Sequence, residues 1–390
     1  MKLSSPQNIF RPAWVQVDLD AVAYNVSQLK SHLGSVKLLA VVKADGYGHG
    51  AVEVARTLEQ KVDYLGVVML EEAYELRKAG INAPILNTAP VSKEVLDYAL
   101  ELDIEQTIDD LDSARNFSKS AEKLNKKGRV HIKVDTGMSR YGLSLSDAVN
   151  IVTEINKLPN IDIVGIFSHF PMSDGLDKSY ALLQIERMMN LKRRLKDAGM
   201  TIPLWHMANS GGALDLPTAH FDMVRVGLLN YGYWPSFEVR QPFDLRPAMS
   251  VKARISTIRT IQRGDSVGYG RKFMAEAEED IAVLPIGYAD GYDRKLSQIG
   301  QVLWRGKRVP IIGGLCMDAA FIRVTEHPEI QVGDEVTLMG IDGEDEISPH
   351  EIAQLIGSVS YEVISRFGRR LPRVYLQGGQ ITIIRNRLTE

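Results

Sequence analysis

The sequence predicts a (β/α)8 barrel followed by a mostly antiparallel β domain. Three observations lead to this fold class. Short runs rich in Val and Ile alternate with longer segments of helical periodicity over residues 38–226. After Pro242 the apolar runs lie closer together and are separated by Gly-Asp pairs. No low-complexity linker divides the two parts, so we expect them to form two adjoining domains of one globular chain.

Eight apolar runs are expected to be the barrel strands, and the spacers between them carry the helices. The expected strands are residues 38–43, 64–69, 84–87, 104–108, 130–135, 161–168, 204–207 and 223–226. Helical periodicity marks residues 51–59, 71–79, 144–158 and 180–198. Alternation alone does not prove that the sheet closes, so a doubly wound open sheet is the competing interpretation.

The second domain is predicted from strand-like runs that end in tight turns. The expected strands are residues 251–261, 281–285, 301–310 and 335–338. Gly264-Asp265 and Gly333-Asp334 supply turns, and one helix is expected at 349–356. These patterns set the predicted boundaries at 12–242 for the barrel and 243–390 for the β domain, with residues 1–11 as candidates to join the latter.

Composition excludes several classes of protein. Hydrophobic residues make up 45% and charged residues 24% of the 390, which is typical of globular proteins. The net charge of -3 gives no electrostatic reason to expect nucleic acid or an anionic membrane as a partner. Cys316 is the lone cysteine, and no apolar run approaches the roughly 20 residues of a membrane helix. Residues 1–11 lack the apolar core of a signal peptide, so we expect a cytoplasmic protein.

The segment VVKADGYGHG at residues 41–50 carries the clearest chemical signal. Lys43 ends the first expected strand, at the face where barrel active sites form. A lysine there can form a Schiff base with an aldehyde cofactor when its amine is deprotonated. The glycines that follow permit a tight loop close to a ligand. For a lone lysine at a strand end, an exposed side chain before a turn is the more common explanation.

The sequence around Lys43 resembles the lysine signature of the alanine racemase family, nearly residue for residue. The resemblance continues over almost the whole chain. It includes HIKVDTGMSR at 131–140, SHF at 168–170, ANS at 208–210, MVRVG at 223–227, VGYG at 267–270, GYADGY at 287–292 and CMD at 316–318. It implies the same barrel and β domain, the cofactor pyridoxal 5'-phosphate, an amino-acid substrate, no metal, and a homodimer whose active sites are shared between subunits.

Racemisation needs a proton to leave one face of the substrate and another to arrive on the opposite face. Two groups on opposite faces of the cofactor are the simplest way to achieve this. By resemblance these catalytic residues are Lys43 and Tyr269. Both side chains ordinarily titrate at about pH 10, so each needs a shifted pKa to act as a base near neutrality. Taken alone, Tyr269 would be a strand tyrosine at a domain edge.

The resemblance also assigns residues to the cofactor. Arg225 corresponds to the residue that faces the pyridine nitrogen, where its guanidinium donates a hydrogen bond without giving up its proton. That arrangement weakens the ring as an electron sink and favours reprotonation over transamination. His169 is expected to lie between Arg225 and the catalytic tyrosine. The cofactor phosphate is expected at late barrel loops, on Asn209, Ser210, Gly227 and Leu228, with Tyr47 reaching over.

The remaining assignments concern the substrate. Arg140, Met317 and Asp318 are expected to bind it. Lys133 stands where many family members carry a carbamylated lysine, whose negative charge would hold Arg140. At the entrance the resemblance implies Tyr288, with Asp174 and Arg294. This sequence departs from the usual pattern at Gly314, Ala319 and Arg369, which affects substrate size and access more than the chemistry.

We therefore expect interconversion of L- and D-alanine, which would supply D-alanine for peptidoglycan. Three alternatives stay open. A racemase of the same family could act on serine or on larger or basic amino acids. A barrel that carries pyridoxal phosphate for homeostasis would usually lack the second domain. A pyridoxal-dependent decarboxylase of the same fold type would need its own C-terminal cysteine motif.

Overall fold

The computed structural model describes residues 11–389, and these divide into two compact units. The barrel unit comprises Ala21–Gly46 and Ala51–Arg246. The β unit comprises residues 11–20, Tyr47–Gly50 and residues 247–389. The predicted boundary after residue 242 stays a prediction. The expectation that residues 1–11 join the β domain concerns, apart from Arg11, residues that lie outside the described part.

The barrel unit is built on a closed barrel of eight parallel strands, which confirms the predicted fold class and excludes an open sheet. The strands are β2 (Lys37–Val41), β3 (Tyr64–Val67), β4 (Ile85–Asn87), β5 (Glu105–Ile108), β6 (Gly128–Lys133), β7 (Ile161–Phe167), β8 (Leu204–His206) and β9 (Met223–Val226). Closure comes from parallel pairing of β9 with β2, in which Met223 lies opposite Lys37 and Val226 opposite Ala40.

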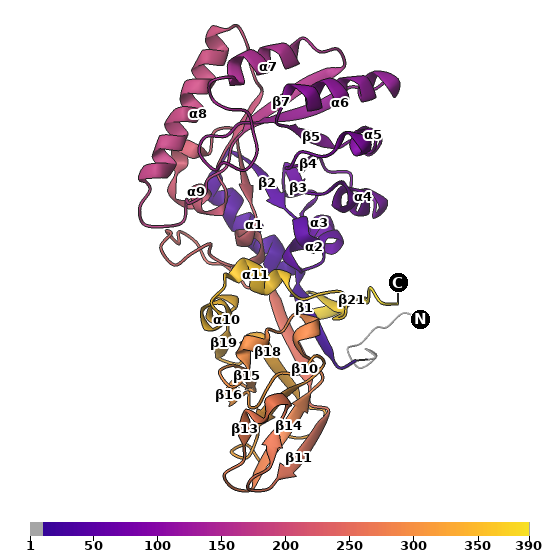
Figure 1. The fold of residues 1–390 in the computed structure, drawn as a ribbon, viewed down its shortest axis with the longest axis vertical. Coiled ribbons are helices and arrows are strands. Elements are labelled where there is room, and N and C mark those ends of the chain that lie inside the picture. The colour runs from indigo at the N-terminus through magenta and orange to yellow at the C-terminus, as the bar shows by residue number, and fades with distance from the viewer. Residues whose placement is uncertain (1–10, 390) are drawn as a thin grey trace. The chain divides into compact units, whose positions relative to one another are not determined.

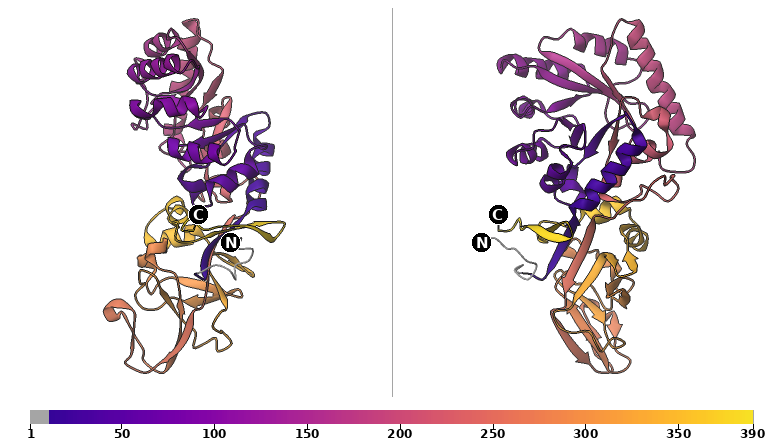
Figure 2. Two further views of the ribbon diagram at one scale, coloured as in Figure 1. Left: turned by 90° about the vertical axis from the view of Figure 1, so that its right-hand side faces the viewer. Right: turned by 180° about the vertical axis from the view of Figure 1, so that it is seen from behind.

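Helices surround the barrel strands in Figure 1 and Figure 2. They are α1 (Leu19–Leu33), α3 (Ala51–Leu58), α4 (Leu70–Lys78), α5 (Leu96–Glu101), α6 (Leu111–Lys123), α7 (Ala148–Asn156), α8 (Ser179–Asp197) and α9 (Ser210–Asp215). Each long helix buries one apolar stripe; α8, for example, buries Ile185, Met188, Leu191 and Leu195 at three- and four-residue spacing. No helix within residues 11–389 is long and apolar enough to cross a membrane.

The β unit contains one large sheet and two small ones. The large sheet runs in the order β16 (Lys307–Pro310), β15 (Gln301–Trp304), β18 (Glu335–Asp342), β10 (Met249–Arg254), β1 (Ala13–Asp18), β20 (Arg373–Gln377), β21 (Gln380–Arg385), and β19 (Asp345–Ile347) pairs with β18. The small sheets are β11 (Thr257–Ile261), β14 (Glu279–Leu284) and β17 (Ala320–Arg323), and the pair β12 (Ser266–Val267) and β13 (Phe273–Met274). Helices α10 (Pro349–Ile356) and α11 (Ser360–Ser365) follow.

Two strand predictions for this unit were wrong, because each took two strands for one. The run at 251–261 is not one strand, because Ile255 donates its backbone N–H to Asp334 and Ser256 donates to Val283. This change of partner places β10 and β11 in different sheets. The run at 301–310 is a hairpin of β15 and β16, which turns at Arg305 and Gly306 with φ of 50° and 77°.

Candidate active site

Lys43 follows β2 and begins α2 (Lys43–Tyr47), a short turn whose backbone is left-handed. Ala44, Asp45 and Gly46 have φ of 51°, 55° and 60°, in the left-handed region. For a residue with a Cβ this conformation costs about 1–2 kcal/mol, so surrounding contacts must hold it. The glycines emphasised in the sequence therefore explain only part of this loop, because Ala44 and Asp45 share its conformation.

Two partly exposed carboxylates hold this turn. One carboxylate oxygen of Glu72 accepts the backbone N–H of Ala44 at 2.7 Å, and the other accepts that of Val68 at 3.0 Å. The Asp45 carboxylate accepts the backbone N–H of Ala51 at 3.0 Å. Glu72, on α4, thus ties the turn after Lys43 to the next barrel loop, a role that the sequence analysis missed.

The amine of Lys43 lies in surroundings that favour its neutral form. Burial lowers its pKa, and the positive charge of Arg140 lowers it further, while Glu72 acts in the opposite direction. Among residues 11–389, its Nζ has no hydrogen-bond or ion-pair partner. A neutral, unpaired amine is the form that attacks an aldehyde.

Arg225, on β9, is a buried guanidinium that donates to the surrounding strand ends. Nη1 donates to Nδ1 of His206 at 3.0 Å, and Nη2 donates to the carbonyl of Ser168 at 2.7 Å and to Nδ1 of His169 at 3.1 Å. Its Nε has no partner among the described residues. Burial lowers the Arg225 pKa to about 9, with a contribution from Arg140.

The end of the barrel that carries these residues is strongly cationic. Burial lowers the pKa of His169 well below its ordinary value, and four cations lower it further. In order of effect they are Arg225, Lys133, Arg140 and Lys43. These four charges therefore lie near one another, around a neutral imidazole. An anionic ligand would relieve their mutual repulsion.

Lys133 is a buried lysine that has no anionic partner among residues 11–389. Its side chain is 5% exposed, and its Nζ lies 4.5 Å from the centre of the Phe167 ring. Burial lowers its pKa well below the ordinary value, and Arg225 and Arg140 lower it further. Burial and the two neighbouring guanidiniums therefore favour the neutral form of this amine.

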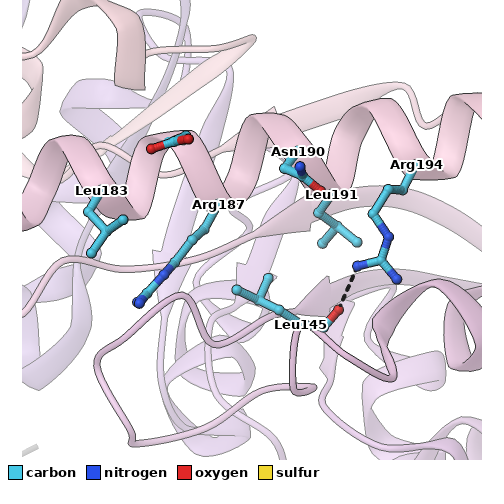
Figure 3. Close-up of a pocket in the computed structure, with 7 residues that line it drawn as sticks. Leu145, Leu183, Arg187, Asn190, Leu191 and Arg194 are labelled. Carbon is cyan, nitrogen blue, oxygen red and sulfur yellow. Dashed lines mark hydrogen bonds between the residues drawn. The ribbon is translucent and has the colours of Figure 1, made fainter.

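Arg140 is exposed at the end of a loop that α8 and an aspartate hold in place. The Asp135 carboxylate accepts the backbone N–H groups of Gly137 and Ser139. From α8, Arg187 donates to the carbonyl of Thr136 at 2.7 Å. Figure 3 shows Arg187 projecting from α8 on the side of the helix where Leu145 lies. The Arg140 loop is thus anchored, whereas the Arg140 guanidinium has no hydrogen-bond or ion-pair partner within residues 11–389.

The predicted phosphate residues lie between β8 and β9 and just after β9. Ser210 begins α9, and its hydroxyl oxygen accepts the backbone N–H of Gly227 at 3.3 Å. Asn209 caps this helix by accepting the backbone N–H of Gly212 at 3.1 Å and also accepts the Ser173 hydroxyl at 2.6 Å. Leu228, fully buried, follows Gly227. The Asn209 side chain is thus already used within the fold.

In the β unit, Tyr269 is held at the surface by a close contact between two glycines. Its side chain is 71% exposed. Gly268 and Gly314 form an isolated bridge, and a Cβ on Gly268 would lie 2.6 Å from the Gly314 carbonyl oxygen. A Cβ on Gly314 would lie 2.8 Å from the Tyr269 carbonyl oxygen. Gly314, a departure from the usual pattern, therefore lies directly against the backbone of the catalytic candidate.

The other candidates of the β unit lie on neighbouring loops. Tyr288, 41% exposed, donates its backbone N–H to Cys316 at 3.2 Å. Met317 is 51% exposed, and a Cβ on Gly287 would lie 2.4 Å from its carbonyl oxygen. The loops that carry Tyr288 and Met317 therefore pack backbone to backbone.

Two arginines and two aspartates fix the same loops. Asp290, which is fully buried, binds Arg11 through both carboxylate oxygens at 2.6 and 2.7 Å. Asp318 pairs with Arg370, so its carboxylate is already bound within this unit.

The ring of Tyr47, 9% exposed, packs against Tyr361 with 6.2 Å between centroids.

The sequence analysis also missed three buried polar residues behind Arg225. His206 contacts Arg225 directly, and Glu105 and His131 continue the chain of hydrogen bonds. For the two histidines, an imidazole between apolar strand residues was the available signal, because such groups are rarely buried without a partner.

Comparison with known proteins gives one family over the whole chain. Residues 17–235 match the model of the alanine racemase N-terminal domain, and residues 248–375 match that of the C-terminal domain. Alanine racemase 2 of Caldanaerobacter subterraneus is 43% identical, covering 97% of this chain and 98% of the relative. The solved alanine racemase of Clostridium difficile 630 is 37% identical with a TM-score of 0.93, covering 98% and 100%. This chain belongs to the alanine racemase family.

Proposed function

We propose that this protein racemises alanine with pyridoxal 5'-phosphate as its cofactor. The observation that carries the proposal is the cationic end of the barrel, where Arg225 contacts His169 and the charges of Lys133, Arg140 and Lys43 also lower the pKa of that imidazole. A cofactor with an anionic phosphate and a substrate with a carboxylate would supply the missing negative charge. Family membership supports the same activity, and D-alanine for peptidoglycan is the expected use of the product.

The residues present fit this cofactor. Lys43 offers an amine with a lowered pKa, the form that can hold an aldehyde covalently. Arg225 offers an Nε–H without a partner among the described residues, which suits the acceptor nitrogen of a pyridine ring. Ser210 and the backbone around Gly227 and Leu228 would hold the phosphate, with Tyr47 as a further candidate. When bound, the cofactor would supply an electron sink for the negative charge that develops at Cα of the substrate.

The chain's own residues would then move the protons. Lys43 would accept a proton at Nζ on one face of the substrate, and Tyr269 would exchange one at its phenolic oxygen on the other. Arg225 would keep its protons, because a guanidinium remains a donor even at the lowered pKa of about 9. Since Nδ1 of His169 accepts from Arg225, its Nε2 carries the proton and is free to orient the tyrosine.

Arg140 and the loop of Met317 and Asp318 would bind the substrate carboxylate, and Tyr288 would line the entrance. The neutral Lys133 amine would attack carbon dioxide, forming an N–C bond and releasing one proton. The resulting carbamate would place a negative charge beside Arg140. Arg140 would then have an anionic partner, which the amine form of Lys133 does not provide.

We infer that the active enzyme is a homodimer in which each site takes Tyr269 from the partner. The high exposure of Tyr269, Met317 and Tyr288 supports this inference, because a catalytic tyrosine open to water is poorly placed to act as a base. A two-fold pair would complete two equivalent sites.

A cytoplasmic location remains a prediction from the lone Cys316, tested by cell fractionation.

The proposed function is tested by the loss of optical activity of L-alanine, L-serine, L-lysine and L-ornithine with the loaded enzyme. We expect alanine to have the highest specificity constant and serine a measurable one, because Gly314 omits a side chain that relatives often carry. A higher specificity constant for lysine or ornithine would make alanine the wrong substrate but leave a racemase. If the loaded enzyme racemises none of the four amino acids, the proposal is overturned.

A further inference from the structure

A chain of hydrogen bonds runs through the barrel unit behind Arg225. Nη1 of Arg225 lies 3.0 Å from Nδ1 of His206 on β8. Nε2 of His206 lies 2.9 Å from Nδ1 of His131 on β6. Nε2 of His131 lies 2.8 Å from a carboxylate oxygen of Glu105 on β5. Glu105 is 3% exposed and both imidazoles are fully buried.

The donor at one end and the acceptor at the other determine every proton between them. Arg225 can only donate, so Nδ1 of His206 must accept and its Nε2 must carry the proton. That proton is donated to His131, so Nδ1 of His131 accepts and its Nε2 donates to Glu105. Burial, with Arg225 as the next cause, lowers the pKa of His206 well below its ordinary value, as this neutral form requires.

The backbone makes room for the contact between His131 and His206, which spans β7. Gly165 of β7 lies opposite His131, and a Cβ there would lie 2.6 Å from Nδ1 of His131. The pairing of β6 with β7 also shifts register at this point: Val130 lies opposite Ile163, but His131 lies opposite Gly165. The shift therefore brings the one residue without a side chain to the place where the two rings meet.

Glu105 supplies the negative charge that Arg225 lacks nearby. Among the described residues, no carboxylate forms an ion pair with Arg225, so the buried guanidinium depends on neutral acceptors. Polarised hydrogen bonds through two imidazoles connect it to the Glu105 carboxylate. The other oxygen of that carboxylate lies 3.4 Å from Arg129, whose side chain is 40% exposed. No group of three His, Cys, Asp or Glu residues within 11–389 is arranged to hold a metal ion.

We propose that Glu105 is a positioning residue of the active site. Acting through His131 and His206, its carboxylate keeps an unprotonated Nδ1 facing Arg225, so that the guanidinium keeps its place and its protons opposite the cofactor ring. The effect on the reaction rests on the proposed function, whereas the direction of the hydrogen bonds does not.

The first test is nitrogen-15 NMR of the histidine rings in the full-length, cofactor-loaded protein. The eight histidines are assigned by single substitutions. We expect Nδ1 of both His131 and His206 to show the chemical shift of an unprotonated nitrogen, and Nε2 that of a protonated one. A protonated Nδ1 on His206 in the wild type would overturn the proposal without any variant of Glu105.

The second test removes the acceptor. In Glu105→Leu, His131 loses its acceptor, and we expect Nδ1 of His206 to move toward the protonated shift. Glu105→Gln keeps an acceptor oxygen and should retain the wild-type ring states. Glu53→Leu is the matched control, because Glu53 is also 3% exposed and pairs with Arg56 on α3. An unchanged His206 in Glu105→Leu, or an equal change in Glu53→Leu, would overturn the proposal.

The reaction gives an independent measurement. Glu105→Leu should lower kcat for racemisation about tenfold with little change in KM, and raise the share of transamination, while Glu105→Gln should restore most of kcat. If Glu105→Leu does not fold, Gly165→Ala separates the two rings instead and should change His206 in the same direction. Borohydride should fix the cofactor to Lys43 in all variants. If it does not do so in the wild type, the proposed function is refuted, but the chain of hydrogen bonds from Arg225 to Glu105 is not.

Discussion

The candidate residues of the barrel unit and those of the β unit differ in how deeply their side chains are buried. Arg225 and Lys133 are 6% and 5% exposed, and burial lowers the pKa of each. Tyr269 and Met317 are 71% and 51% exposed. The barrel thus sets the electrostatics of its residues within one chain, whereas the β unit fixes its loops and leaves their side chains open. This contrast is what a site completed by a second subunit requires.

The largest expected effect comes from replacing Lys43, in the barrel unit. Lys43→Ala should reduce kcat/KM by at least about a thousandfold, because both the covalent hold on the cofactor and one proton carrier are lost. Borohydride should no longer fix cofactor to the chain. Lys93→Ala, which removes an exposed lysine, should keep both properties. Label on another lysine in the wild type would contradict the assignment.

Mixing subunits tests whether the exposed half serves a partner. Lys43→Ala and Tyr269→Phe homodimers each lack one proton carrier at both sites. A mixed dimer has one site with neither and one site with both. Random exchange of equal amounts should therefore restore about a quarter of the native sites.

Mass-tagged subunits show whether exchange has taken place. Activity that stays at the level of the separate variants after demonstrated exchange would place Lys43 and Tyr269 of one chain in the same site. The contrast between the two units would then have another cause.

Arg225 tests whether the charge set by the barrel controls the outcome of the reaction. Arg225→Glu should lower racemisation on the order of a hundredfold and raise transamination, because a carboxylate lets the ring nitrogen keep a proton. Arg225→Lys retains the positive charge and should keep a lower share of transamination. Pyruvate release measured beside D-alanine gives the partition. The same partition in all three proteins would argue against the assignment of Arg225.

Gly314 tests whether backbone contacts place the exposed tyrosine. Because a Cβ at 314 would lie 2.8 Å from the Tyr269 carbonyl oxygen, Gly314→Ala should shift the loop and lower kcat by roughly three- to tenfold. Cofactor labelling on Lys43 should stay normal, since the barrel unit is untouched. Gly264→Ala is the control, because a Cβ at 264 would meet no atom within 4 Å, although its φ of 90° is also strained for alanine. Equal kcat in both variants would contradict the prediction.

The smallest expected effect is on stability and comes from Lys133. The unfolded chain binds a proton at this lysine below its ordinary pKa of 10.5, whereas the folded chain does not until a lower pH. Unfolding therefore takes up a proton in the window between the two values, and stability rises with pH there. Lys133→Met should raise the free energy of unfolding at pH 7 by about 1–3 kcal/mol, with the gain shrinking as the pH approaches 10.5.

Urea unfolding in carbon-dioxide-free buffer measures this gain. Added bicarbonate should reduce it, because a carbamate would stabilise the wild type. A gain that is independent of pH would show that the unpaired amine is not its source.

Sequence periodicity predicted the barrel well because buried parallel strands are continuous apolar runs. All eight predicted barrel strands are present, and the predicted helix at 349–356 matches α10. Periodicity failed in the β unit, where the apolar run at 251–261 gives no sign that β10 ends at Arg254 and that β11 begins at Thr257 in another sheet. Strand β1, at 13–18, was not among the predicted strands, because its partners β10 and β20 lie more than two hundred residues away.

The motifs supplied candidates for the residues that carry the chemistry, but no information on what supports them. The local match around Lys43 said nothing of Glu72, which reaches the turn from α4, or of the left-handed conformation of Ala44 and Asp45. His131 was missed because it is a single polar residue between Val130 and Ile132, and Glu105 because it begins a run of three polar residues in a short strand. Their connection arises only when the barrel closes and places β5, β6 and β8 around one interior.

The register shift between β6 and β7 makes the number of residues in β7 part of the chemistry. Side chains alternate along a strand, so residues two apart share a face. With the extra residue, Val164, the strand directs Gly165 and Phe167 to the same side as His131. There Phe167 stacks on His206 at 4.9 Å and lies beneath Lys133 and Arg225. Without the shift, a regular ladder continuing from Val130 and Ile163 would place Val164 opposite His131 and Ile166 opposite Lys133. A valine side chain would then occupy the place where the two imidazole rings meet, so their contact depends on the one residue of β7 that the ladder skips.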